Sequence, residues 1–91
     1  MYSKKATVIN AVGLHARPAA EFVKMAKKFN SKIILTKEND PKKTFADGKS
    51  IMSVMALCAG TDTIINIEAE GEDENKAVDS LVKLVESGFG E

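Results

Sequence analysis

The chain has 91 residues, which is enough for one compact domain and too few for two. Thirteen Lys and Arg residues balance thirteen Asp and Glu residues, so the net charge gives no support for nucleic-acid binding. The single cysteine, Cys58, excludes an internal disulfide and a cysteine-based zinc site. Because no apolar run approaches membrane-spanning length and the N-terminus lacks a signal-peptide pattern, we expect a cytoplasmic protein without membrane insertion.

Apolar periodicity predicts the elements of the first half of the chain. Residues 5–10 are typical of a short strand, and residues 16–30 place apolar side chains at the three- and four-residue spacing of a helix. Pro18 would lie in the first turn of this helix, where its missing N–H removes no helical hydrogen bond. β-branched residues predict a second strand at 32–37, and a turn then leads to a short returning strand at 44–46.

The second half alternates in the same way between helix and strand patterns. Residues 51–58 predict a short helix with Ser50 as its N-cap, and residues 63–69 alternate as a last strand. A final amphipathic helix is predicted to be capped by Asp73 and ended by Gly88. The resulting order, β-α-β-β-α-β-α, predicts two layers in which helices pack on one face of a small sheet.

His15, the only histidine, precedes the first predicted helix within residues 13–20. A histidine in such a loop is usually only a polar residue near a helix cap. Here, however, a phosphate beside it could accept hydrogen bonds from the backbone N–H groups of Ala16 and Arg17 at the helix start. The Arg17 guanidinium also suits phosphate oxygens. No metal-ligand cluster or nucleotide loop stands nearby, so we predict a phosphoryl carrier that needs no cofactor or metal.

The residues around this histidine carry a family resemblance. Gly13-Leu14-His15-Ala16-Arg17-Pro18-Ala19 resembles the active-site signature of HPr, the histidine-containing phosphocarrier of the bacterial phosphoenolpyruvate:sugar phosphotransferase system. The second HPr signature is present at residues 49–57, and the resemblance extends over residues 1–91 as a single domain. It implies an α+β fold, a two-layer open-faced sandwich in which three helices pack on one face of a four-stranded antiparallel sheet.

The resemblance also implies a function for the histidine. His15 would accept a phosphoryl group on its ring Nδ1 from phosphorylated enzyme I, and would donate it to the IIA domains of sugar permeases. Arg17 would balance the charge of the phosphate in both transfers. The protein would thus be phosphorylated itself as phosphohistidine, rather than act as a free-standing enzyme.

Ser50 is the second candidate site. As an N-cap it would stabilise its helix by about 1 kcal/mol, and this role needs no function. In HPr proteins of many Gram-positive bacteria, however, the matching serine is phosphorylated by an ATP-dependent kinase/phosphorylase. The resemblance therefore implies regulation at Ser50, with that kinase and a catabolite-repression transcription factor as partners. The added negative charge would oppose acidic partners that approach His15.

A partner interface is predicted on the first two helices. The short helix after Ser50 is apolar nearly all round and cannot bury every side, and exposed methionines suit a surface that fits several partners. Lysines on the outer face of the first helix could steer acidic partners, and a small alanine leaves room for them. The predicted interface consists of Ala20, Lys24, Lys27, Ile51, Met52 and Met55. Cys58 is predicted to be a small buried hydrophobe.

Two other functions stay open at this point. One is a regulatory binding module that works through Ser50 without carrying phosphate to sugars, although relatives of that kind lose the histidine that this chain keeps as His15. The other is a nitrogen-related or dihydroxyacetone-type phosphorelay, which would keep the histidine chemistry and change the partners. The motif around Ser50 favours the sugar system over this second alternative.

Overall fold

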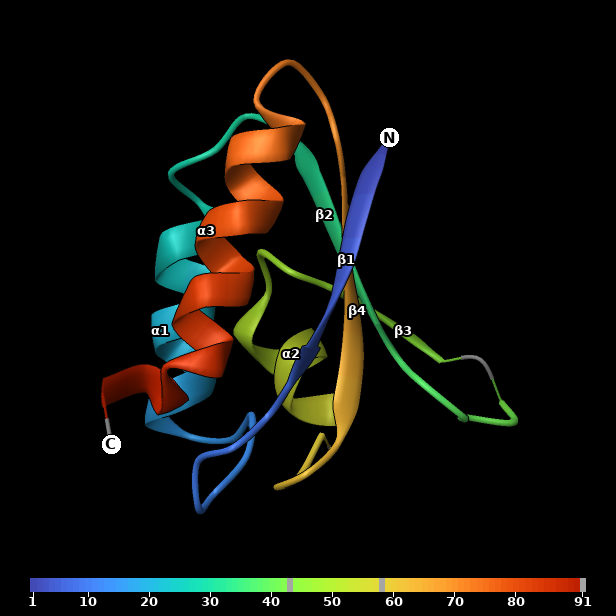
Figure 1. Cartoon of the computed structure of the whole chain (residues 1–91), viewed down its shortest axis with the longest axis vertical. Helices are drawn as coiled ribbons and strands as arrows, with labels where there is room; N and C mark the ends of the chain where they lie inside the picture. The colour runs from blue at the N-terminus through green and yellow to red at the C-terminus, as the bar shows by residue number, and fades with distance from the viewer. Residues whose placement is uncertain (43, 58, 91) are drawn as a thin grey trace.

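The computed structural model describes residues 1–42, 44–57 and 59–90, and within them it forms a sheet covered by helices (Figure 1). The elements follow the predicted order. They are β1 (Tyr2–Thr7), α1 (Arg17–Ala26), β2 (Lys32–Lys37), β3 (Phe45–Asp47), α2 (Ile51–Ala56), β4 (Ile64–Glu70) and α3 (Glu74–Glu86), followed by a 3-10 turn at Gly88–Gly90.

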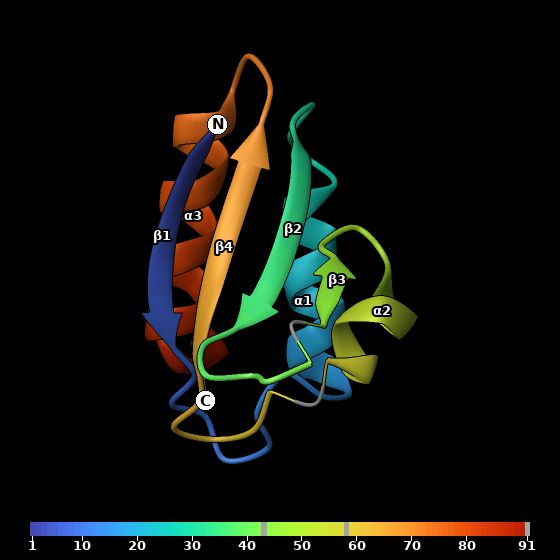
Figure 2. The same ribbon diagram turned by 90° about the vertical axis from the view of Figure 1, so that its right-hand side faces the viewer.

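The four strands form one antiparallel sheet in the order β1-β4-β2-β3. In its register Ile65 of β4 pairs with Ala6, and Ile67 pairs with Leu35, so apolar side chains of neighbouring strands share one face. The helices cover this face and leave the other face of the sheet open (Figure 2). The predicted two-layer open-faced sandwich, with three helices on a four-stranded antiparallel sheet, is confirmed.

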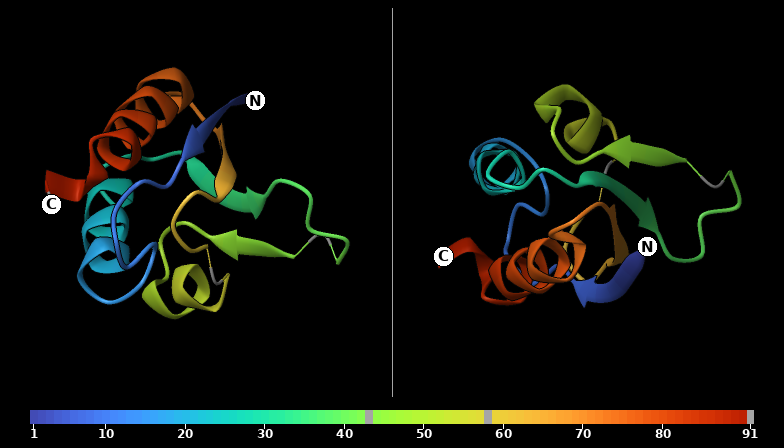
Figure 3. Two further views of the ribbon diagram at one scale, coloured as in Figure 1. Left: turned by 60° about the horizontal axis from the view of Figure 1, so that its bottom comes forward. Right: turned by 90° about the horizontal axis from the view of Figure 1, so that it is seen from above.

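The core lies between the sheet and the helices. The alternating pattern of β4 buries every second side chain, β1 buries only Ala6, and the helical pattern of α1 and α3 buries one stripe of each helix. Helix α3 packs on β1 and β4, α2 packs on β3, and α1 lies between α2 and α3 (Figure 3). The largest fully buried side chains are Phe22, Leu14, Ile33, Leu35, Leu57, Ile65, Ile67 and Leu81.

Several predicted boundaries shift. Strand β2 occupies its predicted residues, and β3 and β4 each lie one residue later than predicted. Strand β1 runs over Tyr2–Thr7 rather than residues 5–10, because its pairing with β4 begins at Tyr2 and ends at Thr7. Val8 still donates its backbone N–H to the Thr63 carbonyl over 2.9 Å, so the chain beyond β1 remains attached.

Two predicted helices are shorter than their apolar patterns suggested. Helix α1 ends at Ala26 rather than near Asn30, because the following N–H groups of Lys28 and Phe29 bond three residues back in turns. Helix α2 begins at Ile51 as predicted and ends at Ala56. The prediction for Cys58 falls outside the residues that the structure describes.

Asp73 precedes α3 as predicted, but its side chain does not cap that helix. The carboxylate instead accepts hydrogen bonds from the backbone N–H groups of Asn30, at 2.8 Å, and Ser31, at 3.0 Å, and from the Ser31 hydroxyl. The Ser31 hydroxyl bond is the largest cause that holds the pKa of Asp73 below its ordinary value. Asp73 therefore joins the segment between α1 and β2 to the start of α3.

Candidate phosphorylation site

His15 lies on the loop between β1 and α1, and its side chain is exposed. It lines a cleft of about 270 Å³ that is otherwise almost entirely apolar. The cleft is bounded by the β1–α1 loop, by α2 and by the segment that leads to β4. Its lining residues are Val12, Leu14, His15, Met55, Ala59 and Gly60. Segments distant in the sequence thus meet around the one imidazole of the chain.

The loop before His15 is packed tightly against the chain after α2. The Leu14 side chain is buried, and its backbone N–H donates to the Ala59 carbonyl over 2.8 Å. Gly13 has φ +68°, and a Cβ there would lie 2.5 Å from the Ala59 carbonyl oxygen. Both the conformation and the close approach therefore require glycine at this position. This packing fixes the backbone that carries His15.

Ala16, the N-cap of α1, has an uncommon backbone conformation with φ 52° and ψ −123°. L-residues with a side chain rarely adopt this region, so the conformation costs about 1–3 kcal/mol. The alanine side chain offers no cap hydrogen bond, although the Ala16 carbonyl accepts from the Ala20 N–H over 3.1 Å. Within the described residues, no internal hydrogen bond occupies the N–H of Ala16 or of Arg17.

Arg17 is the first residue of α1, and its side chain is exposed. It takes part in none of the ion pairs that the described part of the chain forms. The next residue, Pro18, is buried and supplies no N–H to the first turn. His15 and Arg17 therefore flank the strained Ala16 at the positive end of the helix dipole, an arrangement that suits a phosphate.

The predicted N-cap role of Ser50 is confirmed. Its Oγ accepts a hydrogen bond from the backbone N–H of Ser53 over 3.3 Å. The Ser53 hydroxyl in turn accepts from the backbone N–H of Asp47 over 2.8 Å. Lys49, just before the cap, donates its ammonium to the Phe29 carbonyl over 2.7 Å and ties the start of α2 to the end of α1.

The predicted interface residues lie on helices that contact each other. Ala20 and Lys24 are exposed on α1, and Lys27 is exposed directly after its end. Ile51 and Met52 are exposed at the start of α2, with exposed fractions of 43% for Ile51 and 78% for Met52. Met55 is half-buried, and the structure brings it together with His15 at the cleft.

The apolar loop residues Ile9 and Val12 were missed by the sequence reasoning. Their exposed fractions are 53% for Ile9 and 54% for Val12, and Val12 lines the cleft beside His15. One signal could have found them: apolar residues in a strand-to-helix loop that fall outside the periodicity of either element. Val12 extends the apolar surface beside His15, whereas Ile9 lies near Gly88 at the end of α3.

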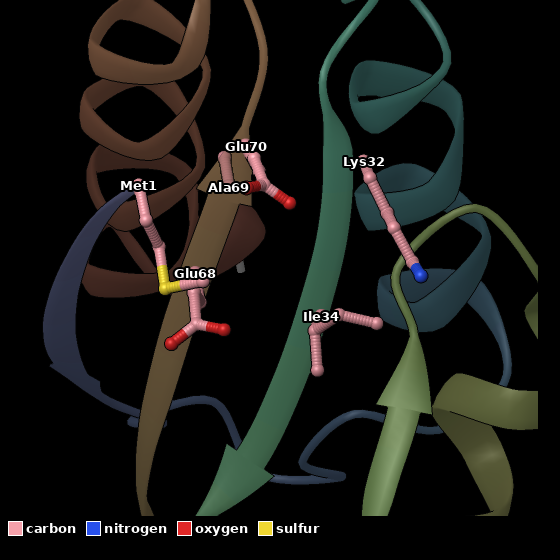
Figure 4. A pocket seen from close by; sticks show the side chains of 6 residues that line it. All are labelled: Met1, Lys32, Ile34, Glu68, Ala69 and Glu70. Atoms are coloured by element: carbon pink, nitrogen blue, oxygen red, sulfur yellow. The ribbon is translucent and has the colours of Figure 1, made fainter.

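A second depression of about 160 Å³ lies at the end of the sheet where β4 stops and β2 begins (Figure 4). Lys32 and Ile34 of β2 line it together with Glu68 and Glu70 of β4, and Met1 lies at its side. Helix α1 begins at the opposite end of the molecule (Figure 2). This depression is therefore separate from the His15 cleft.

In residues 1–42, 44–57 and 59–90, no group of His, Cys, Asp and Glu side chains could hold a metal ion. The helices of this part are all too short or too polar to cross a membrane.

Comparison with known proteins gives a consistent result. A family model described as the PTS HPr component phosphorylation site matches residues 2–87. The phosphocarrier protein HPr of Pseudomonas putida is 41% identical over 91 residues, which cover 100% of this chain and 98% of that protein. HPr of Haemophilus influenzae is 45% identical over 85 residues, covering 93% of this chain and 95% of that protein. The crystal structure of HPr from Thermoanaerobacter tengcongensis matches with a TM-score of 0.90 at 43% identity, over 100% of this chain and 98% of that one.

An open-faced α+β sandwich that presents one exposed histidine at a helix start, together with these matches, defines a histidine phosphocarrier domain. The chain belongs to the HPr family, the phosphocarrier proteins of the phosphotransferase system. Membership implies partners of that system, such as enzyme I and IIA components.

Proposed function

We propose that His15 carries the phosphoryl group: its Nδ1 accepts the group from phosphorylated enzyme I and donates it to the IIA domains of sugar permeases. One observation carries the proposal. The exposed imidazole lies beside the first turn of α1, where the described residues leave the N–H groups of Ala16 and Arg17 without an internal hydrogen bond. Since phosphoenolpyruvate is available inside the cell, we place this exchange in the cytoplasm.

In the accepting step, the lone pair of the neutral His15 Nδ1 attacks phosphorus, and the bond from phosphorus to the donor breaks with its electron pair leaving on the donor. The reverse sequence passes the group to the acceptor. Such a transfer asks mainly for positioning and for electrostatic stabilisation of the phosphoryl oxygens. The Arg17 guanidinium and the helix N-terminus supply that stabilisation, so no further covalent chemistry by the chain is required.

The predicted interface provides the surface on which both partners would dock in turn. Met52 and Ile51 expose apolar area next to the cleft, and Met55 continues this area to His15. Lys24 and Lys27 add positive charge on the neighbouring helix. An apolar centre with a basic margin suits acidic partners that have an apolar patch.

The test is phosphorylation by phosphoenolpyruvate and enzyme I, followed by transfer to a purified sugar-specific IIA domain. We expect an acid-labile phosphate that His15→Ala abolishes. Arg17→Ala should slow transfer by about tenfold or more, since it removes a charged phosphate contact, whereas Lys28→Ala, an exposed cation beyond the other end of α1, should not. No label on the wild-type chain, or label that persists in His15→Ala, would refute the carrier role. If the labelled phosphate passes to an acceptor of a nitrogen-related system and not to the sugar-specific IIA domain, the sugar assignment is refuted.

We further propose that an ATP-dependent kinase phosphorylates Ser50 and that the modified chain binds a catabolite-repression transcription factor. Ser50 lies at the N-cap of α2, next to the exposed Ile51 and Met52, so a phosphate there would sit in the docking surface. Incubation with the kinase and ATP should give an acid-stable phosphate that Ser50→Ala abolishes. Ser53→Ala should keep the label, and label at Ser53 instead would overturn the assignment.

A further inference from the structure

The side chain of Asn10 is an unusual feature of the loop that leads to His15. It is buried, with an exposed fraction of 5%. Its Nδ2 donates to the Gly13 carbonyl over 2.8 Å, and the Gly13 N–H donates back to the Asn10 carbonyl over 3.2 Å. One residue thus holds both the N–H and the C=O of Gly13, and the turn over residues 10–13 is closed by two hydrogen bonds.

The amide of Asn10 is only partly satisfied. Its Oδ1 is buried and has no hydrogen-bond partner in the described part of the chain. An unpaired buried amide oxygen costs free energy that an apolar side chain of similar size would not. Ser31, the other buried polar residue described, has its hydroxyl bonded to Asp73. A role in stability alone therefore explains Asn10 poorly.

Thr61 holds the same turn from the other side. Its Oγ1 lies 2.7 Å from the Asn10 carbonyl oxygen and 3.0 Å from that of Ala11. Together with the Leu14 N–H bond to Ala59, these contacts fasten the loop to the segment before β4. These contacts hold the backbone from Asn10 to Leu14, and His15 follows directly with its side chain exposed.

We infer that Asn10 and Thr61 are positioning residues, which set the place of the His15 imidazole for in-line phosphoryl transfer through their hydrogen bonds to the loop backbone. The inference rests on the proposed function of His15. Both side chains bond to loop backbone and neither belongs to the predicted interface on α1 and α2, so their removal displaces the nucleophile with little effect on partner binding. Displacement of a reacting group by about 1 Å can slow a reaction by as much as a hundredfold.

The test is the steady-state rate of phosphorylation by enzyme I as the concentration of the chain is varied. Asn10→Ala should lower kcat by about tenfold or more while KM stays within about twofold of the wild type. Thr61→Val should lower kcat in the same way, and Thr61→Ser, which keeps the hydroxyl, should restore it. If Asn10→Ala does not fold, the comparison of Thr61→Val with Thr61→Ser tests the inference instead.

Ser31→Ala is the matched control, because it removes a buried hydroxyl beyond the other end of α1. It should lower Tm and leave kcat unchanged. The inference is overturned if Asn10→Ala and Thr61→Val keep kcat within twofold, if KM changes instead of kcat, or if Ser31→Ala lowers kcat equally. If the wild-type chain takes no phosphate on His15, both the proposed function and this inference are overturned. If the wild-type chain is phosphorylated on His15 and the variants keep the wild-type kcat, the inference is overturned and the proposed function stands.

Discussion

Replacement of Ala16 by glycine tests whether the start of α1 is strained. Ala16 has φ 52° and ψ −123°, a conformation that glycine adopts at little cost and that a residue with a Cβ does not. Ala16→Gly removes one methyl group from an exposed position and disturbs no described side-chain hydrogen bond. We therefore expect the variant to be more stable than the wild type.

The magnitude follows from opposing contributions. Release of the strained backbone stabilises the folded chain by about 1–3 kcal/mol. Glycine is also a better N-cap than alanine, by several tenths of a kcal/mol to about 1 kcal/mol. Glycine also has a larger backbone entropy in the unfolded chain, which lowers the stability of the folded chain by about 0.5–1 kcal/mol. The midpoints of these ranges give a net gain of about 2 kcal/mol, and for a domain of this size 1 kcal/mol raises Tm by about 4–8 °C.

Thermal and urea unfolding followed by circular dichroism measure this effect. Ala20→Gly is the matched control, because Ala20 is an exposed alanine of the same helix with ordinary helical geometry. That change should lower the free energy of unfolding by about 1 kcal/mol. Opposite signs for the two substitutions are the expected result. A lower Tm for Ala16→Gly, or equal losses at the two positions, would refute the strain argument.

Three further predictions concern the packing and charge of the loops. Gly13→Ala should destabilise the fold by at least about 2 kcal/mol, since its Cβ would lie 2.5 Å from the Ala59 carbonyl oxygen at a positive φ; an unchanged urea midpoint would contradict this. Hydrogen bonds from Ser31 and Asn30 lower the pKa of Asp73 in the folded chain. The ionised carboxylate therefore stabilises the fold fully above its ordinary pKa of about 4, and this stabilisation is lost as the pH falls through the lower folded pKa. Asp73→Asn should therefore flatten the loss of Tm below about pH 4, and a parallel pH profile would exclude this role. Ser50→Ala should lower the free energy of unfolding by about 1 kcal/mol through loss of its cap, whereas Ser50→Gly should cost only a few tenths, and equal losses would contradict capping.

Local patterns were sufficient to predict most of the elements. Strand β2 was predicted without error because the β-branched residues Ile33, Ile34 and Thr36 cluster there and turn residues follow them. The N-cap at Ser50 was likewise predicted, since its hydrogen bond to Ser53 depends on residues only three apart. The positions of the candidate site residues in the fold were also predicted. His15 and Arg17 share a helix start, so their spacing already indicated a phosphate site.

Only the tertiary structure decided the features that depend on distant contacts. The bounds of β1 follow from its pairing with β4, and the Asp73 carboxylate leaves its own helix for Ser31, more than forty residues away. The strain at Ala16 shows in no local pattern; it belongs to a loop that Leu14 fastens to the chain beyond α2. In the same way, Met55 and Val12 lie beside His15 only because the fold closes a cleft there. Sequence by itself therefore determined which residues are proposed to carry the chemistry, since hydrogen bonding and helix geometry are local. The fold decided what surrounds them, because packing joins segments that no periodicity relates.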